Sequence, residues 1–211
     1  LDELGVQYIE CGNPSSNPKD MEFFERLQSM RLSHATLVAF GATCRKEEPP
    51  EQDEGLRALL AAGTPCVAIF GKCSTLHVSE ILGTSKGENL RMIRETCRFL
   101  TAQGRKVIFD AEHFFDGYRL DADYAMDCLG AAAEGGACSL CLCDTNGGGQ
   151  PWEIAEITGV VCSRFSIPVA IHCHNDSGTA IAATIMAVRA GASQVQGTFL
   201  GIGERCGNTA L

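Results

Sequence analysis

The sequence predicts an α/β protein, a TIM-type (β/α)8 barrel that is truncated: its first strand is missing at the N-terminus and its last helix is missing or incomplete. Three observations predict this fold. Apolar, β-branched runs recur along the 211 residues, segments with helical periodicity separate them, and polar groups follow nearly every run. The spacing of the runs, mostly ~30 residues, suits strands joined by helices.

Seven runs are expected to be strands. Five of them follow a glycine, as the loop from a helix to a strand requires, because glycine readily adopts the left-handed conformation that ends a helix. These five cover residues 6–10, 66–70, 106–109, 138–143 and 194–199. Two more, residues 34–40 and 168–174, follow helices that end without glycine.

The segments between the runs show helical periodicity. One apolar stripe consists of Leu90, Ile93, Cys97 and Leu100, and another of Ile154, Ile157, Val161 and Phe165. Such stripes are typical of helices that bury one face. Strands alternating with helices imply right-handed βαβ units and a parallel sheet.

Seven parallel strands fit either an open doubly wound sheet or a barrel that lacks one unit. A barrel gathers the carboxyl ends of all its strands around one mouth, whereas an open sheet uses chiefly those at its switch point. Nearly every predicted strand ends in groups suited to chemistry: Glu10, Lys72, Glu112, Asp144, His174 and Glu204. This distribution favours the barrel.

A complete barrel usually needs about 250 residues. Residues 1–5 have the character of a helix end with no strand before it, and residue 211 follows closely on the seventh strand. We therefore expect residues 1–211 to form a single, partial catalytic domain.

Composition narrows the possible partners and location. The net charge of −9, without a run of lysine or arginine, argues against nucleic acid or an anionic membrane as a partner. No apolar run approaches the ~18 residues of a membrane span. The 12 cysteines are scattered through apolar segments, as expected for buried thiols in a reducing compartment. The sequence thus predicts a cytoplasmic protein.

A metal site is indicated at the end of the sixth strand. The alternation of a strand points His172 and His174 to the same face, and two neutral imidazoles suit a borderline divalent ion. Packed or surface histidines are the alternative. One βα unit later, the glycine-rich loop 201–208 would let Asn208 reach inward; its spacing and position differ from a dinucleotide fingerprint.

Two further polar sites are expected at the mouth. Asp110 and Glu112 lie two residues apart on a strand, so both side chains should face the interior. They could bind metal, act as a base, or repel one another enough to raise the pKa of one of them. A salt-bridged pair is the alternative. The hydroxyl of Thr145 could donate to a substrate carboxylate, unless Asp144 or Thr145 only caps the following helix.

Taken together, three motifs resemble a barrel family that comprises isopropylmalate, homocitrate and citramalate synthases and hydroxymethylglutaryl-CoA lyase. These motifs are residues 172–176 (HCHND), 201–208 (GIGERCGN) and 144–147 (DTNG). The resemblance spans essentially the whole chain. Residues 110–118 (DAEHFFDGY), with residues 70–72, 76–78 and 13–20, look like the citramalate synthase branch of that family.

The resemblance implies roles for individual residues. It implies a divalent metal, either Mg, Mn or Zn, held by His172, His174 and Asn208. It further implies that Glu112 is the base and that Thr145 contacts the carboxylate of the keto acid. Glu10 and Asp110 are assigned to substrate binding.

The family's strand-1 motif, D-T-T-L-R-D-G, supplies a fourth metal ligand and an arginine for the keto acid, and this sequence lacks it. The fragment is therefore expected to bind metal weakly and to be inactive.

The expected activity of the whole protein is a Claisen-type condensation of acetyl-CoA with pyruvate to citramalate and CoA, in isoleucine biosynthesis, by a homodimer. A synthase using a longer 2-keto acid and a lyase are alternatives within the family. An alternative of another class is a non-catalytic barrel that binds a small anion or scaffolds a partner.

Overall fold

Seven parallel strands form one sheet whose order in space is their order in the chain. The computed structural model describes residues 1–211. The strands are β1 (Tyr8–Glu10), β2 (Thr36–Ala42), β3 (Cys66–Lys72), β4 (Lys106–Glu112), β5 (Ser139–Asp144), β6 (Val169–Cys173) and β7 (Gln194–Gln196). All seven predicted strands are confirmed. β7 ends three residues earlier than expected, because the chain turns into a short 3-10 helix, η2 (Phe199–Gly201).

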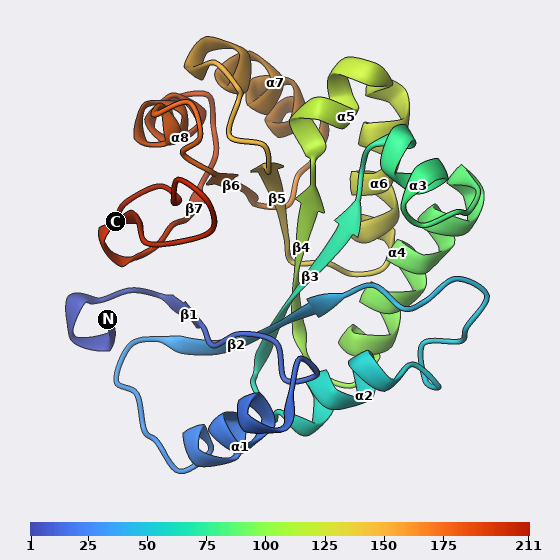
Figure 1. Ribbon diagram of the computed structural model, residues 1–211, viewed down its shortest axis with the longest axis vertical. Helices are drawn as coiled ribbons and strands as arrows, with labels where there is room; N and C mark the ends of the chain where they lie inside the picture. The colour runs from blue at the N-terminus through green and yellow to red at the C-terminus, as the bar shows by residue number, and fades with distance from the viewer.

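Helices cover the outer face of this curled sheet (Figure 1). They are η1 (Asp2–Leu4), α1 (Pro18–Leu27), α2 (Glu54–Ala61), α3 (Thr75–Glu80), α4 (Lys86–Ala102), α5 (Phe114–Leu120), α6 (Ala122–Glu134), α7 (Pro151–Arg164) and α8 (Ala180–Arg189). Helix starts follow local chemistry. The side chain of Asn17 caps α1, and Pro18 takes the first helical position, where its missing N–H costs nothing.

Two buried clusters hold the fold together. The larger, of 39 residues, lies between the sheet and the helices and includes Phe109 and Leu140, both fully buried. Burial of each large side chain of this kind contributes about 1.5–3 kcal/mol. The smaller cluster, of 7 residues, fills the inside of the curl with side chains such as Val38, Ile108 and Cys141. The sheet is therefore buried on both faces, as parallel sheets usually are.

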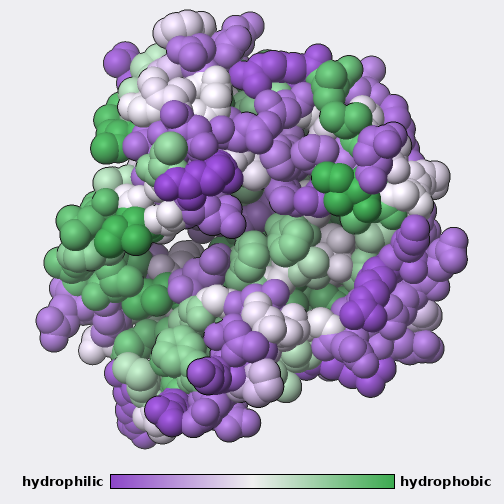
Figure 2. Space-filling view, in the orientation of Figure 1, coloured by the Kyte–Doolittle hydropathy of each residue, from purple (hydrophilic) through white to green (hydrophobic).

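The strand order excludes the open doubly wound alternative. That arrangement reverses direction at a switch point, whereas here each strand from β1 to β7 pairs with its neighbours in the chain. The curl leaves β1 and β7 as the two edges (Figure 1). Figure 2 shows the molecule hollowed near its centre, with apolar side chains over the C-terminal segment, where Phe199, Leu200 and Ile202 are exposed.

Register places the expected site residues beside one another. Lys72 on β3 lies opposite Glu112 on β4, and His172 on β6 lies opposite Gln196 on β7. All 12 cysteines are free, and most are buried. None of the helices combines the length and the apolar character that crossing a membrane would demand.

Candidate active site

A cavity of about 340 Å³ opens at the carboxyl end of the sheet. All seven strands contribute to its lining, together with the loops after β5 and β6 and the glycine-rich loop after β7. The lining includes Glu10, Phe40, Phe70, Asp110, Glu112, Thr145, His172, His174, Gln196 and Asn208. The structure therefore brings together every residue that the sequence predicted for the site. In barrels of this kind, ligands bind at this end of the strands.

His172 and His174 both line the cavity, and their rings point their Nε2 atoms toward each other. Their Nε2 atoms are 3.3 Å apart. Burial, and after it the neighbouring His174, lower the pKa of His172 to about 4, so this imidazole is neutral near pH 7. Burial also lowers the pKa of His174. Two neutral rings at this distance can share a proton in a hydrogen bond, as packed histidines do, or direct both lone pairs at one ion.

A side chain of β7 orients His172. The Nδ1 atom of His172 lies 3.0 Å from Oε1 of Gln196, and Nε2 of Gln196 donates to Oδ1 of Asp110 at 2.9 Å. The amide nitrogen of Gln196 donates to Asp110, which places the amide oxygen of Gln196 next to His172. This oxygen can only accept, so Nδ1 of His172 carries the proton. The lone pair of His172 then resides on Nε2, which faces the cavity.

Asn208 completes the group from the loop after β7. Its side-chain amide lies 3.4 Å from Nε2 of His172, and its Oδ1 is buried without a hydrogen-bond partner. Gly203 makes the approach possible, because a Cβ atom at that position would clash with the Asn208 amide. A buried oxygen without a partner is unfavourable and suits a site for a ligand.

These donors fit a divalent metal ion, although incompletely. Two nitrogen ligands ~2.0–2.1 Å from one ion lie ~3.3–3.4 Å apart at a tetrahedral angle, which matches the 3.3 Å between the histidines. Nδ1 of His174 is buried and has no partner. No three His, Cys, Asp or Glu side chains gather in a metal-binding arrangement. The donor set is therefore two imidazoles and one amide, which leaves positions open.

The acidic residues behave in two different ways. Burial raises the pKa of Asp110 to about 7, and desolvation in the cavity, followed by the nearby Asp110, raises that of Glu10, although Glu10 is an exposed residue of β1. Glu112 instead pairs with Lys72, whose Nζ lies 2.6 Å from Oε2 of Glu112. The alternative of a salt bridge is thus correct for Glu112, although its partner is Lys72. The ion pair involves Oε2 only, so the second carboxylate oxygen of Glu112 keeps its lone pairs for a substrate proton.

Thr145 is held by the backbone of the neighbouring loop. Its Oγ1 accepts a hydrogen bond of 2.8 Å from the backbone N–H of His113, a residue in the left-handed conformation with φ 55°. The hydroxyl proton of Thr145 is therefore free to be donated. The helix-cap alternative is wrong, because Gln150 is the N-cap of α7 and Asp144 accepts from the N–H of Gly149.

Three contributors to the site were missed by sequence reasoning. The alternation of β7 could have indicated Gln196, because the apolar Val195 packs toward the helices and its neighbours Gln194 and Gln196 face the opposite side of the sheet. The aromatic rings of Phe40 and Phe70, stacked with centroids 5.2 Å apart, line the cavity from the ends of β2 and β3. Phe70 belongs to the motif of residues 70–72 that resembles the citramalate synthase branch and Phe40 to a predicted strand, but no site role was expected for either ring.

The comparisons with known proteins agree with this geometry. The family model described as HMGL-like matches residues 1–211, the whole chain. The chain belongs to the HMGL-like family.

Relatives of this HMGL-like chain include synthases. It is 51% identical over its full length to a Synechocystis sp. protein named (R)-citramalate synthase, of which it covers 40%. It is 35% identical to a probable 2-isopropylmalate synthase of Methanopyrus kandleri, again covering 40% of that protein. The chain thus spans well under half the length of the curated relatives it matches.

The same fold occurs in solved structures. Hydroxymethylglutaryl-CoA lyase from Pseudomonas aeruginosa superposes with a TM-score of 0.79 at 21% identity, over 100% of this chain and 72% of the lyase. At that identity the likeness concerns the fold alone. The expected barrel architecture of this HMGL-like chain is confirmed.

Proposed function

We propose that the protein to which this chain belongs condenses acetyl-CoA with pyruvate to give citramalate and CoA, with the help of a divalent metal ion. The observation that carries the proposal is the convergence of His172, His174 and Asn208 beside Glu112, in a chain 51% identical to an (R)-citramalate synthase. The 35% identity to a probable 2-isopropylmalate synthase makes a longer keto acid the weaker alternative. The product would serve isoleucine biosynthesis, and we expect a homodimer.

His172, His174 and Asn208 are the residues that would hold the ion. When bound, it would polarise the ketone of the keto acid and offset the negative charge that develops on the oxygen. Gln196 fixes the tautomer of His172 that presents Nε2 to the ion. Thr145, whose Oγ1 already accepts from His113, would donate its hydroxyl proton to the carboxylate of the keto acid.

Glu112 is the proposed base. Its carboxylate would take a proton from the methyl group of acetyl-CoA, directly or through water, so that the C–H electrons form the enolate. The enolate carbon would bond to the ketone carbon of pyruvate, and water would then cleave the thioester to release CoA. Lys72, 2.6 Å from Glu112, supplies a positive charge beside the site of proton transfer.

Metal removal tests the function as a whole. The full-length protein should release CoA from acetyl-CoA and pyruvate, lose this activity in excess chelator, and regain it when a divalent ion is returned. The same assay with 2-ketoisovalerate and 2-ketoglutarate measures the choice of keto acid. Full activity in chelator would exclude the metal, and a preference for a longer keto acid would favour the alternative synthase.

Replacement of the base tests the role of Glu112. Glu112→Gln should lower the turnover of the full-length enzyme by about 10²-fold or more, because the amide cannot accept the proton. Metal affinity, measured by calorimetry, should change little, since Glu112 is not among the proposed ligands. Glu25→Gln, on the exposed surface of α1, is the control. An unchanged rate in Glu112→Gln would remove this residue from the mechanism.

A further inference from the structure

The chain turns sharply at His113, directly after Glu112. His113 is the N-cap of α5 and has left-handed backbone angles, φ 55° and ψ 35°. Residues other than glycine seldom adopt this conformation, because their Cβ atom then crowds the backbone. Such conformations persist only where the surrounding contacts hold them, and they cluster at functional sites. The contacts that hold His113 therefore also bear on the placement of Glu112.

The peptide group that joins Glu112 to His113 is held from both sides. Its carbonyl oxygen accepts a hydrogen bond of 3.1 Å from the backbone N–H of Cys73, in the loop after β3. Its N–H donates to Oγ1 of Thr145, in the loop after β5, at 2.8 Å. The segments that follow the two neighbouring strands thus fix the backbone that carries the carboxylate of Glu112.

The ring of His113 is held by a second set of contacts. Its Nδ1 lies 3.3 Å from Oδ2 of Asp116, and the same oxygen accepts from the amide of Asn146 at 2.7 Å. The ring of His77 packs against it at a right angle, with centroids 4.2 Å apart. The side chain of His113 is only 15% exposed. Because Asn146 follows Thr145 in the chain, the loop after β5 holds both the backbone and, through Asp116, the ring of His113.

The close packing of α5 leaves the turn little freedom. The N–H of Gly117 donates to the carbonyl oxygen of His113 at 2.8 Å. Gly117 lies against the backbone of Cys73, where a Cβ atom would clash with the carbonyl oxygen. A rotation of the backbone at His113 would therefore press α5 against the loop after β3.

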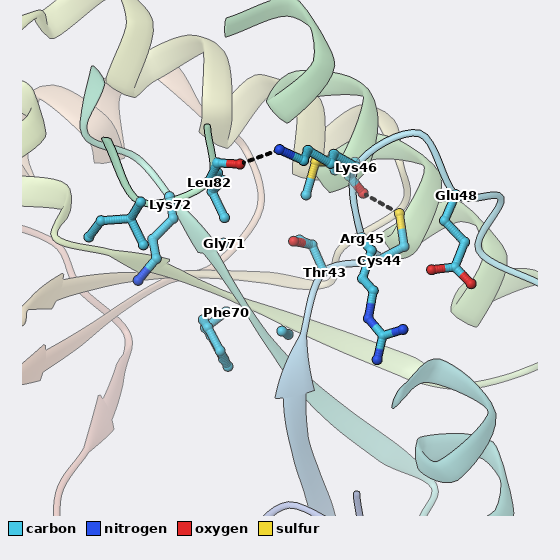
Figure 3. A pocket seen from close by; sticks show the side chains of 12 residues that line it. Thr43, Cys44, Arg45, Lys46, Glu48, Phe70, Gly71, Lys72 and Leu82 are labelled. Carbon is cyan, nitrogen blue, oxygen red and sulfur yellow. Dashed lines mark hydrogen bonds between the residues drawn. The ribbon is translucent and has the colours of Figure 1, made fainter. Parts of the chain in front are cut away.

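Lys72 fixes the other end of Glu112. Its Nζ lies 2.6 Å from Oε2 of the carboxylate. Figure 3 shows its ammonium group turned away from Lys46, on the far side of the neighbouring cavity. The place of the Glu112 carboxylate is thus set by the turn at His113 on the backbone side and by one ion pair at its tip.

We propose that His113 is a positioning residue, whose left-handed backbone, held by Thr145 and Asp116, sets the separation between Glu112 and Thr145. The inference rests on the proposed function, in which Glu112 takes a proton from one substrate and Thr145 holds the other. The carbon that loses the proton must lie within bonding reach of the ketone, so the two side chains have to keep a fixed separation. His113 acts through these two residues.

Two substitutions in the full-length protein isolate this role. His113→Asn is the conservative variant, because asparagine tolerates the left-handed conformation and its amide nitrogen can replace Nδ1 beside Asp116. His113→Ala removes the ring and keeps a Cβ atom that disfavours the turn. His34→Ala, which removes an exposed ring from the loop before β2, is the matched control. Thermal unfolding of each variant verifies that it is folded.

Amide hydrogen exchange tests the turn without any turnover. In His113→Ala, exchange across residues 112–118 should become about tenfold faster or more, because the turn opens more often. His113→Asn should stay within about threefold of the wild type, and His34→Ala should match it. Unchanged exchange in His113→Ala would overturn the inference, whatever the activity of the protein.

Kinetics test the consequence for the reaction. His113→Ala should lower kcat for CoA release by about tenfold or more and leave the calorimetric affinity for a divalent ion unchanged, while His113→Asn should restore most of the rate. Ion affinity falling in step with kcat, or equal rates in His113→Ala and the wild type, would overturn the positioning role. A wild type that releases no CoA would contradict the proposed function instead, and the exchange measurement would then decide on the turn by itself.

Discussion

At the scale of single residues, the candidate site depends on a short chain of polar contacts behind the ligands. Asp110 accepts from Gln196, and Gln196 accepts from His172, with distances of 2.9 and 3.0 Å. Such partners hold a ligating imidazole in one tautomer and one orientation, and their loss typically lowers metal affinity ~10–100-fold. If His172 binds the proposed ion, Gln196 is expected to position it through this hydrogen bond.

Substitution of Gln196 tests this role. Gln196→Leu should weaken binding of a divalent ion by ~10–100-fold in calorimetry on the full-length protein, because His172 loses the acceptor for Nδ1. Gln194→Leu is a matched control on the same strand, where the amide oxygen accepts from Ser139 and touches no histidine. Equal losses in the two variants would point to a general disturbance of β7 and contradict the positioning role.

At the scale of elements, the loop that carries Asn208 is fastened to its neighbours by Arg205. The guanidinium makes a bidentate pair with Asp176, with distances of 2.8 and 2.9 Å, and donates to the carbonyl oxygen of Thr145 at 2.6 Å. Gly147 lets Asp176 approach, since a Cβ atom there would lie 2.6 Å from its carboxylate. The loops after β5, β6 and β7 are thereby joined on one side of the site.

Loss of this contact should loosen the loop without unfolding the protein. Arg205→Ala should raise the rate of amide hydrogen exchange across residues 201–208 and weaken metal binding several-fold, while thermal stability changes little because the pair is partly exposed. Arg205→Lys should recover only part of the protection, since lysine lacks the planar fork. Arg26→Ala, which breaks an exposed pair with Glu22, is the control. Unchanged exchange in Arg205→Ala would contradict this role of the loop contact.

For the whole molecule, an acid buried inside the curled sheet makes folding depend on pH. Burial raises the pKa of Asp110, which is 5% exposed, to about 7. Between its ordinary pKa near 4 and about pH 7, the folded state keeps a proton that the unfolded chain has lost. The contribution of Asp110 to stability is therefore present at low pH and is lost as the pH rises through 7.

Asp110→Asn isolates this contribution. Asparagine keeps an oxygen for the hydrogen bond from Gln196 but does not ionise. Relative to the wild type, metal-free Asp110→Asn should gain on the order of 1–3 kcal/mol in free energy of unfolding between pH 5 and pH 8. The comparison between variants matters, because His172, with a pKa lowered to about 4, changes stability in the opposite direction below pH 6.5. Parallel stability curves for the two proteins would show that Asp110 ionises normally.

The order and number of strands could be predicted because each βα unit is a local pattern. A glycine such as Gly63 or Gly104, followed by an apolar run, marks a strand wherever it occurs, and β3 and β4 begin where expected. The period of two along a strand placed Asp110 with Glu112, and His172 with His174, on one face. Those pairings are confirmed by the cavity that all four residues line.

Strand periodicity sets side-chain direction, so the amino-acid order alone shows which side chains face the mouth of the sheet, and the motifs alone show which family the chain resembles. The contact partners of these side chains come from the folded arrangement. The pairing of Glu112 with Lys72, of His172 with Gln196 and of Thr145 with the backbone of His113 joins residues from separate units of the chain. Those contacts depend on the register between neighbouring strands and on loop conformations such as the left-handed His113, neither of which a local pattern encodes.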